Sequence, residues 1–211
     1  MDLELLISTF VTLFVIVDPI GLVPIFLAVT HGMSGRERRR AAVEAALVSF
    51  GVLAGALLIG EWLLRNLGIG LPAFRIAGGV LLFVIGFEML FDRRQRRKAD
   101  DASDVVQERQ SGVAIFPLAI PLMSGPGAIT AAVLLSSNAD GDAASLLSLL
   151  GVFALVIGIT FVVFLLAPWL ERVFGHKTQS ILVRLLGILL AALAVQFIVD
   201  GIAEVFALGG G

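Results

Sequence analysis

Long apolar runs are the feature of this 211-residue sequence that most restricts its fold. Apolar residues make up 58% of the chain and charged residues 15%, whereas soluble domains average about 45–50% and about 25%. A soluble domain of this length cannot bury such a surplus, because much of its surface stays in water. The composition therefore indicates a chain surrounded by lipid and excludes a soluble enzyme. The net charge of −2 gives no sign of a nucleic-acid partner, and the lack of cysteine excludes disulfides and thiolate metal sites.

Six segments are long and apolar enough to cross a membrane, since a hydrocarbon core of about 30 Å needs roughly 20 helical residues. These predicted spans are Leu5–Thr30, Ala41–Leu64, Pro72–Phe91, Val113–Ser137, Ser145–Leu170 and Arg184–Ala207. We therefore predict an all-α integral membrane protein with one transmembrane domain over residues 1–211. Residues 1–91 hold the first three helices, residues 92–112 form a charged cytoplasmic loop, and residues 113–211 hold the other three.

The basic residues predict the direction of the spans. Thirteen of the fifteen fall in the first, third and fifth connections, which share one side of the membrane if six spans exist. Because basic loops stay in the cytoplasm, both termini are expected outside. The run Arg93–Lys98 in the third connection is interpreted as a solvated topology anchor, with a lipid-headgroup contact as the alternative.

Two pairs of landmarks predict an internal repeat. Asp18-Pro19-Ile20-Gly21 precedes Gly125-Pro126-Gly127-Ala128 by 107 residues, and Arg75 precedes Arg184 by 109 residues, each of the two arginines opening a span. Each half holds three spans, so the second half enters the membrane from the opposite side, as in many secondary transporters. The alternative is chance similarity between apolar segments rich in glycine and proline.

Prolines predict that the first and fourth spans are broken. These two spans hold five of the seven prolines, namely Pro19, Pro24, Pro117, Pro121 and Pro126. A proline inside a helix removes one backbone donor and leaves the carbonyl four residues earlier without its usual partner. Pro19 and Pro24 would free the carbonyls of Val15 and Ile20 in this way. Such carbonyls are tolerated at membrane depth only inside the protein or beside water.

The residues around the two breaks predict a substrate site. Asp18 is expected to cap a half-helix that begins at Pro19, and Ser124-Gly125-Pro126 follows the same pattern. Helix N-termini suit a carboxylate, and the freed carbonyls with the Asp18 carboxylate suit an ammonium or a small cation. The predicted substrate-binding residues are Asp18, Pro19, Gly21, Pro24, Ser124, Gly125, Pro126 and Gly127. Proline kinks that serve packing alone are the alternative.

Three further polar residues are candidates for a coupling or polar path, because acids inside a span are functional candidates. They are Glu88, Gln196 and Asp200, of which the last two are one helical turn apart. Glu88 alternatively snorkels to the neighbouring basic loop. We find no catalytic motif and no histidine cluster, so we expect no enzyme activity, no metal and no cofactor.

The two proline motifs resemble a known family. Asp18-Pro19-Ile20-Gly21-Leu22-Val23-Pro24-Ile25-Phe26 is similar to the (Asn/Asp)-Pro-x-Gly-x-x-Pro-x-Phe pattern in the first span of the MarC family. Phe116–Leu122, followed by Gly125–Thr130, is similar to the family's fourth span. The resemblance covers essentially the whole chain. It implies a six-helix protein of the bacterial inner membrane, related to the LysE-like exporters, some members of which are described as neutral amino-acid transporters.

We therefore expect a secondary transporter of a small polar solute such as a neutral amino acid, coupled to a proton or a sodium ion. The alternatives are a narrow channel, or a membrane protein with a structural or regulatory role and no transport. The expected partners are the lipid bilayer, the substrate and a second copy of the chain, without nucleic acid.

Overall fold

The computed structural model describes residues 3–91, 93–94, 119, 123–136 and 143–208. Within these residues all regular structure is helical, as predicted. The helices are α1 (Leu3–Val17), α2 (Val23–Val29), α3 (Gly35–Asn66), α4 (Leu71–Leu90), α6 (Pro126–Ser136) and α7 (Ala143–Leu208).

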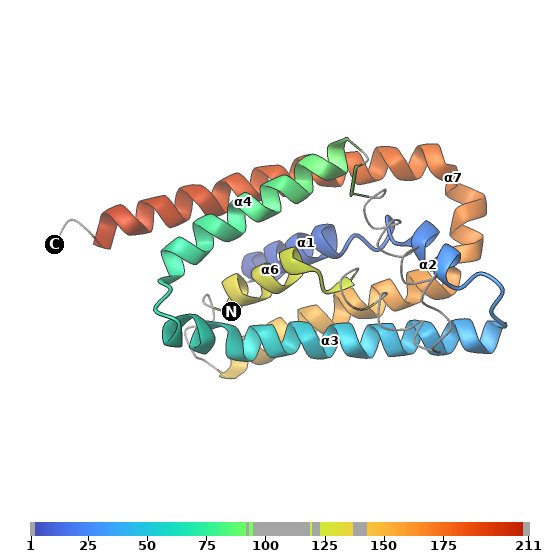
Figure 1. Ribbon diagram of the computed structural model, residues 1–211, viewed down its shortest axis with the longest axis horizontal. Helices are drawn as coiled ribbons and strands as arrows, with labels where there is room; N and C mark the ends of the chain where they lie inside the picture. The colour runs from blue at the N-terminus through green and yellow to red at the C-terminus, as the bar shows by residue number, and fades with distance from the viewer. Residues whose placement is uncertain (1–2, 92, 95–118, 120–122, 137–142, 209–211) are drawn as a thin grey trace.

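Within the part of the chain that the structure describes, four helical segments are long and apolar enough to cross a membrane, and they correspond to the predicted second, third, fifth and sixth spans. They are Gly35–Asn66, Leu71–Leu90, Ala143–Val173 and Thr178–Ala207. This confirms that the chain is an α-helical membrane protein. The connection expected between Leu170 and Arg184 is itself helical, so that α7 contains both of the last two spans. Figure 1 shows α7 turning back on itself, with its two long parts running in opposite directions.

The predicted first and fourth spans are shorter in the structure. α1 ends at Val17 and α2 begins at Val23, so the predicted break in the first span is confirmed. α6 begins at Pro126, whereas most of the predicted fourth span before Met123 lies outside the described residues. The apolar helical stretches Leu6–Val17 and Pro126–Ser136 are each too short to cross about 30 Å alone. The six-helix inverted repeat stays a prediction.

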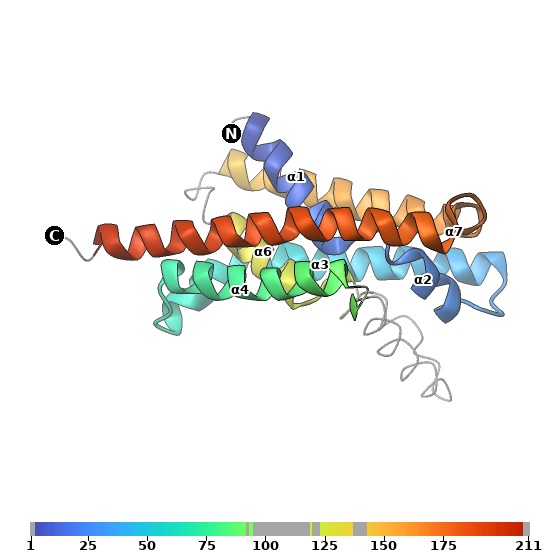
Figure 2. The same ribbon diagram turned by 90° about the horizontal axis from the view of Figure 1, so that it is seen from above.

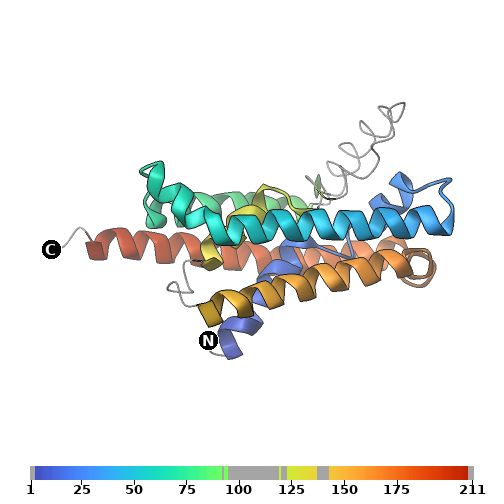
Figure 3. The same ribbon diagram turned by 90° about the horizontal axis from the view of Figure 1, so that it is seen from below.

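The short helix α6 and the end of α1 lie in the middle of the bundle. In Figure 1 they are between α3 and the first part of α7 on one side, and α4 and the last part of α7 on the other. Figure 2 shows the last part of α7 running alongside α4, and Figure 3 shows α3 and the first part of α7 running side by side. The end of α1, where the first span breaks, is therefore enclosed by other helices.

The ends of the helices sort into two groups along the long axis. One end of the bundle holds the start of α1, the end of α7 and the α3–α4 connection (Figure 1). The other end holds the α2–α3 connection and the turn in α7.

Glycines allow α4 and the last part of α7 to pack backbone against backbone. A Cβ atom on Gly86 would lie 2.8 Å from the carbonyl oxygen of Gly187, and one on Gly79 would lie 2.8 Å from that of Ala194. A Cβ atom on Gly201 would lie 2.9 Å from the carbonyl oxygen of Pro72. Small residues at such crossings are typical of helix pairs in membranes, where close van der Waals packing drives association.

Candidate functional site

Asp18 is the residue at which the first span breaks. Its φ of 57° lies in the left-handed region, which ends the regular turn of α1. Its backbone N–H still donates to the carbonyl of Phe14 at 2.9 Å, and its own carbonyl accepts from Leu22 at 3.1 Å. Its Oδ1 atom accepts from the backbone N–H of Gly21 at 3.0 Å, which is the geometry of a helix cap. Asp18 therefore ends α1 and also caps the turn that leads into α2.

The regular helix after the break begins later than the sequence suggested. We predicted a start at Pro19, but residues 19–22 form turns and α2 begins at Val23. Pro24 occupies the first turn of α2, where a missing N–H removes no helical hydrogen bond. The capping role of Asp18 is thus observed on a single turn rather than on α2 itself.

Gly21 is required by the position of the Asp18 carboxylate. A Cβ atom at Gly21 would lie 2.1 Å from Oδ2 and 2.6 Å from Cγ of Asp18, far inside van der Waals contact. Asp18 is only 1% exposed, so its carboxylate has little room to move away. The Asp-Pro-x-Gly motif therefore forms one structural unit, in which the glycine makes space for the acid.

Two side chains from distant parts of the chain bind carbonyls at the break. Nη2 of Arg94 donates to the carbonyl of Ile16 at 2.5 Å, and its Nη1 contacts the sulfur of Met89 at 3.0 Å. Nε2 of Gln179, on α7, donates to the carbonyl of Ile20. Pro24 cannot donate to that carbonyl, as the sequence predicted, and the carbonyl also accepts from the backbone N–H of Val23 at 3.2 Å. Both donor side chains are buried, Arg94 at 6% and Gln179 at 8% exposure.

Sequence analysis missed both donors. Arg94 belongs to a basic run that is typical of a solvated loop, and no local signal separates it from the exposed Arg93. Gln179 is a lone amide at the start of a long apolar stretch. The sequence signal for such a donor is the Ile20 carbonyl, to which Pro24 cannot donate.

The start of α6 is built differently from the break at Asp18. Pro126 is the first residue of α6, as predicted, and the carbonyl of Gly125 accepts from Ile129 at 3.1 Å. The Ser124 hydroxyl does not reach back to this helix but donates to the carbonyl of Ser49 on α3 at 3.2 Å. A Cβ atom at Gly127 would lie 2.5 Å from Cδ1 of Ile85, so the space beside this glycine is filled by α4.

The two motifs lie close together in the bundle. A Cβ atom on Gly127 would be 3.7 Å from Cγ2 of Ile16, two residues before Asp18. Asp18 and Ser124 are both 1% exposed, whereas Gly125 is half-buried and Pro126 is exposed. The structure thus places the end of α1 against the start of α6. Whether the eight predicted residues bind a substrate stays a prediction.

A cavity of about 230 Å³ adjoins the break, between α1, α2 and both parts of α7. Its walls are apolar except for the amide of Gln179 and the carboxylate of Glu171. The lining residues are Phe14, Ile20, Val23, Val163, Leu170, Glu171, Gln179 and Leu182. The cavity is large enough for the apolar part of a small metabolite and lies beside the carbonyl of Ile20.

The other predicted polar residues do not all gather at the break. Nε2 of Gln196 donates to Oδ1 of Asp200 at 2.7 Å, which confirms their shared face, but both side chains are exposed on the outside of α7. Glu88 is half-buried on α4. Within the described part of the chain, no group of three residues suits a metal ion.

Arg75 forms an ion pair between α4 and the end of α7. Its Nη1 atom lies 3.0 Å from Oε2 of Glu204, and both side chains are partly buried. The pair explains why a basic residue stands at the otherwise arginine-poor end of the bundle.

Comparisons with known proteins agree with this architecture. A family model described as "MarC family integral membrane protein" matches residues 3–206. A UPF0056 membrane protein of Archaeoglobus fulgidus is 37% identical over 93% of this chain and 92% of its own length. The UPF0056 membrane protein YvbG of Bacillus subtilis is 30% identical over 98% of both chains, and YhcE of Escherichia coli is 31% identical over 97% of this chain and 95% of its own. These names give no substrate, and no solved structure gives a significant match.

Proposed function

The chain belongs to the MarC family of integral membrane proteins, and we propose that it is a secondary transporter of a small polar solute, most suitably a neutral amino acid. The observation that carries the proposal is the break at Asp18. A buried carboxylate and two backbone carbonyls that accept from side chains lie together at the break, beside a cavity of about 230 Å³.

The hydrogen bonds at the break suggest how a substrate is held. In the present arrangement, side-chain donors of Arg94 and Gln179 bind the carbonyls of Ile16 and Ile20. An ammonium group supplies three donors and no acceptor, so it suits Asp18 together with these carbonyls. In our proposal the ammonium of the substrate displaces the Gln179 amide from Ile20, while the apolar part of the substrate enters the adjoining cavity. Such an exchange of partners keeps the backbone satisfied at every stage, as the membrane interior requires.

The inverted repeat completes the proposal. Its support is the antiparallel pair of α4 and the end of α7, which correspond to the third helix of each half. The close contacts of Gly79 with Ala194 and of Gly86 with Gly187 are seven residues apart on both helices, as a two-fold relation between the halves requires. The basic asymmetry of the loops supports termini outside the cell and a location in the inner membrane. Glu88, which is half-buried on α4, is our candidate for coupling to a proton or sodium ion.

Counterflow in proteoliposomes tests the transport proposal. Vesicles loaded with unlabelled alanine or glycine, with the purified chain inserted, receive the labelled amino acid outside. We expect transient accumulation of label that saturates with concentration, as a carrier requires. A leak without saturation would identify a channel. No uptake of a panel of small zwitterions would leave the structural or regulatory role as the better account and would refute our proposal.

A further inference from the structure

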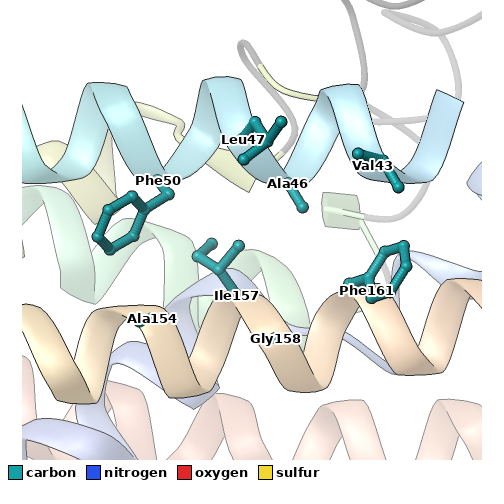
Figure 4. A pocket seen from close by; sticks show the side chains of 8 residues that line it. All are labelled: Val43, Ala46, Leu47, Phe50, Ala154, Ile157, Gly158 and Phe161. Carbon is teal, nitrogen blue, oxygen red and sulfur yellow. The ribbon is translucent and has the colours of Figure 1, made fainter. Parts of the chain in front are cut away.

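An apolar groove runs along the outside of the bundle between α3 and the first part of α7. It has a volume of about 280 Å³ and opens toward the surroundings of the protein. Four residues of α3, between Val43 and Phe50, form one wall, and four residues of α7, between Ala154 and Phe161, form the other (Figure 4). All eight lining residues are apolar, and Leu47 is 66% exposed. In a membrane protein such a groove faces lipid.

The groove wall on α3 continues into arginines toward the α2–α3 connection. Val43, Leu47 and Phe50 follow one another at intervals of three or four residues, which places them on one face of the helix. The same spacing extended backwards reaches Arg39 and Arg36, both exposed. One face of α3 is therefore basic at its start and apolar over the next turns.

The opposite wall shows the same change of character. On α7, Arg172 lies eleven residues, or about three turns, beyond Phe161. It is exposed, as is Trp169, an aromatic residue of the kind found at membrane interfaces. The start of α3 and the turn in α7 lie at the same end of the bundle (Figure 1). Arginines of both helices thus border the same end of the groove.

Two acidic residues near this end already have partners within the protein. Glu44 pairs with Arg40 at 2.6 Å, and Glu37 accepts the backbone N–H of Ser34 at 2.7 Å. Glu171 lines the other cavity, described above. Arg36, Arg39 and Arg172 are exposed and can meet an outside anion.

The distance along α3 fits one leaflet of a bilayer. From Arg40 to Phe50 is ten residues, or about 15 Å of helix at 1.5 Å each. This equals half of a hydrocarbon core of about 30 Å. With Phe50 near the midplane, the arginines lie at the level of the headgroups.

We propose that the groove between α3 and α7 binds an anionic phospholipid of the cytoplasmic leaflet. One acyl chain lies in the apolar groove, and the headgroup phosphate lies among Arg36, Arg39 and Arg172. Basic residues next to grooves between membrane helices favour anionic headgroups by charge. The binding ties α3 to α7 at the end of the bundle where both helices leave the membrane.

Native mass spectrometry of the purified full-length chain tests the proposal. Phosphatidylglycerol and phosphatidylcholine with identical acyl chains are titrated separately, and the bound lipid is counted. We expect at least tenfold tighter binding of phosphatidylglycerol. The double variant Arg36→Gln/Arg39→Gln should weaken its binding about fivefold for each arginine removed, whereas Arg65→Gln, at the other end of α3, should not. Equal binding of the two lipids by the wild-type chain would overturn the proposal.

Filling the groove separates the acyl chain from the headgroup. A Cβ atom at Gly158 meets no atom within 4 Å, so Gly158→Leu adds a side chain to the groove without distorting the helix. We expect it to reduce the binding of both lipids and to leave their ratio unchanged. Gly55→Leu is the matched control, because Gly55 also has open space but lies on another face of α3. Ala154→Leu provides a second filling variant.

Two results contradict the proposal at this step. Unchanged lipid binding by both filling variants would show that the groove is not the site. A shift from dimer to monomer in the filling variants, with lipid binding unchanged, would identify a second copy of the chain as the occupant.

Discussion

Gly21→Ala is the substitution that tests most directly how the break is built. The new Cβ atom would lie 2.1 Å from Oδ2 and 2.8 Å from Oδ1 of Asp18. The carboxylate, buried by its surroundings, must then turn away and give up its bond to the Gly21 N–H. A hydrogen bond to a charged group contributes about 1.5–3 kcal/mol, and a buried N–H left without a partner is costly. We therefore expect a loss of about 2–3 kcal/mol in the free energy of unfolding.

Thermal unfolding of the purified protein in detergent measures this loss. A change of about 2–3 kcal/mol lowers the Tm by roughly 4–12 °C in a chain of this size. Gly55→Ala is the matched control, since its Cβ atom meets nothing within 4 Å. It should be neutral or stabilising, because alanine favours a helix over glycine by about 0.5–1 kcal/mol.

A double-mutant cycle separates the clash from a general effect of alanine in the turn. Asp18→Gly removes the carboxylate and also suits the positive φ at this position. If the clash causes the destabilisation, Gly21→Ala should cost less than about 0.5 kcal/mol in the Asp18→Gly background. An undiminished cost in that background would refute the reasoning.

Three further predictions concern the helix packing, the buried arginine and the start of α3. Gly86→Ala should destabilise the chain by about 1–3 kcal/mol in thermal unfolding, because its Cβ atom would lie 2.8 Å from the Gly187 carbonyl oxygen. Gly51→Ala is the control, since its Cβ atom meets nothing within 4 Å, and it should not destabilise the chain. Arg94→Ala should cost about 1.5–3 kcal/mol by removing the donor to Ile16, and Arg93→Ala, at an exposed position, should cost little. Hydrogen bonds from Ser34 lower the pKa of Glu37 below its usual 4.5, so its stabilising effect is present above that pH and is lost as pH falls through the lowered pKa. The protection factors of the amides at the start of α3 should therefore fall on acidification, and Ser34→Ala, which removes the side-chain contribution and keeps the backbone N–H, should reduce this pH dependence.

The helices that cross the membrane without interruption were predictable from the sequence. α3 contains the whole predicted span Ala41–Leu64 and extends beyond it at both ends. α4 begins and ends one residue before the predicted span Pro72–Phe91. In lipid the backbone has to satisfy its own hydrogen bonds, so an apolar run of sufficient length can only be a helix. The same reasoning does not predict that the chain stays helical between Leu170 and Arg184, because this connection is shorter and more polar.

The break was predictable because its causes are local. Pro19 and Pro24 cannot donate, and Asp18 precedes Gly21 by three residues, which is the spacing of a side-chain cap. The positive φ of Asp18 was not predicted, since an ordinary cap has extended backbone. It follows from the double role of Asp18, whose N–H completes α1 while its side chain caps the next turn.

The partners of the freed carbonyls were not predictable because they come from far along the chain. Arg94 is 78 residues from Ile16, and Gln179 is 159 residues from Ile20. Proline chemistry predicts a need for donors at the carbonyls of Val15 and Ile20, not at that of Ile16, and it does not say which residues they are. Gly127 was likewise predicted to bind the substrate from its neighbours in the sequence alone. In the described structure, the side chain of Ile85 fills the space beside it.

Asp18→Asn distinguishes a cap from a charge in the proposed transport site. The asparagine Oδ1 can accept from the Gly21 N–H as the carboxylate does, and asparagine tolerates a positive φ as well as aspartate. The variant should therefore unfold within a few degrees of the wild-type Tm. If the carboxylate binds the ammonium of the substrate, losing the charge removes about 1.5–3 kcal/mol of binding, which is about a 10- to 150-fold loss of affinity in counterflow. Asp18→Ala, which loses both cap and charge, should fail in both assays. Wild-type transport by a stable Asp18→Asn protein would mean that Asp18 serves only as a cap, and that the ammonium of the substrate binds elsewhere.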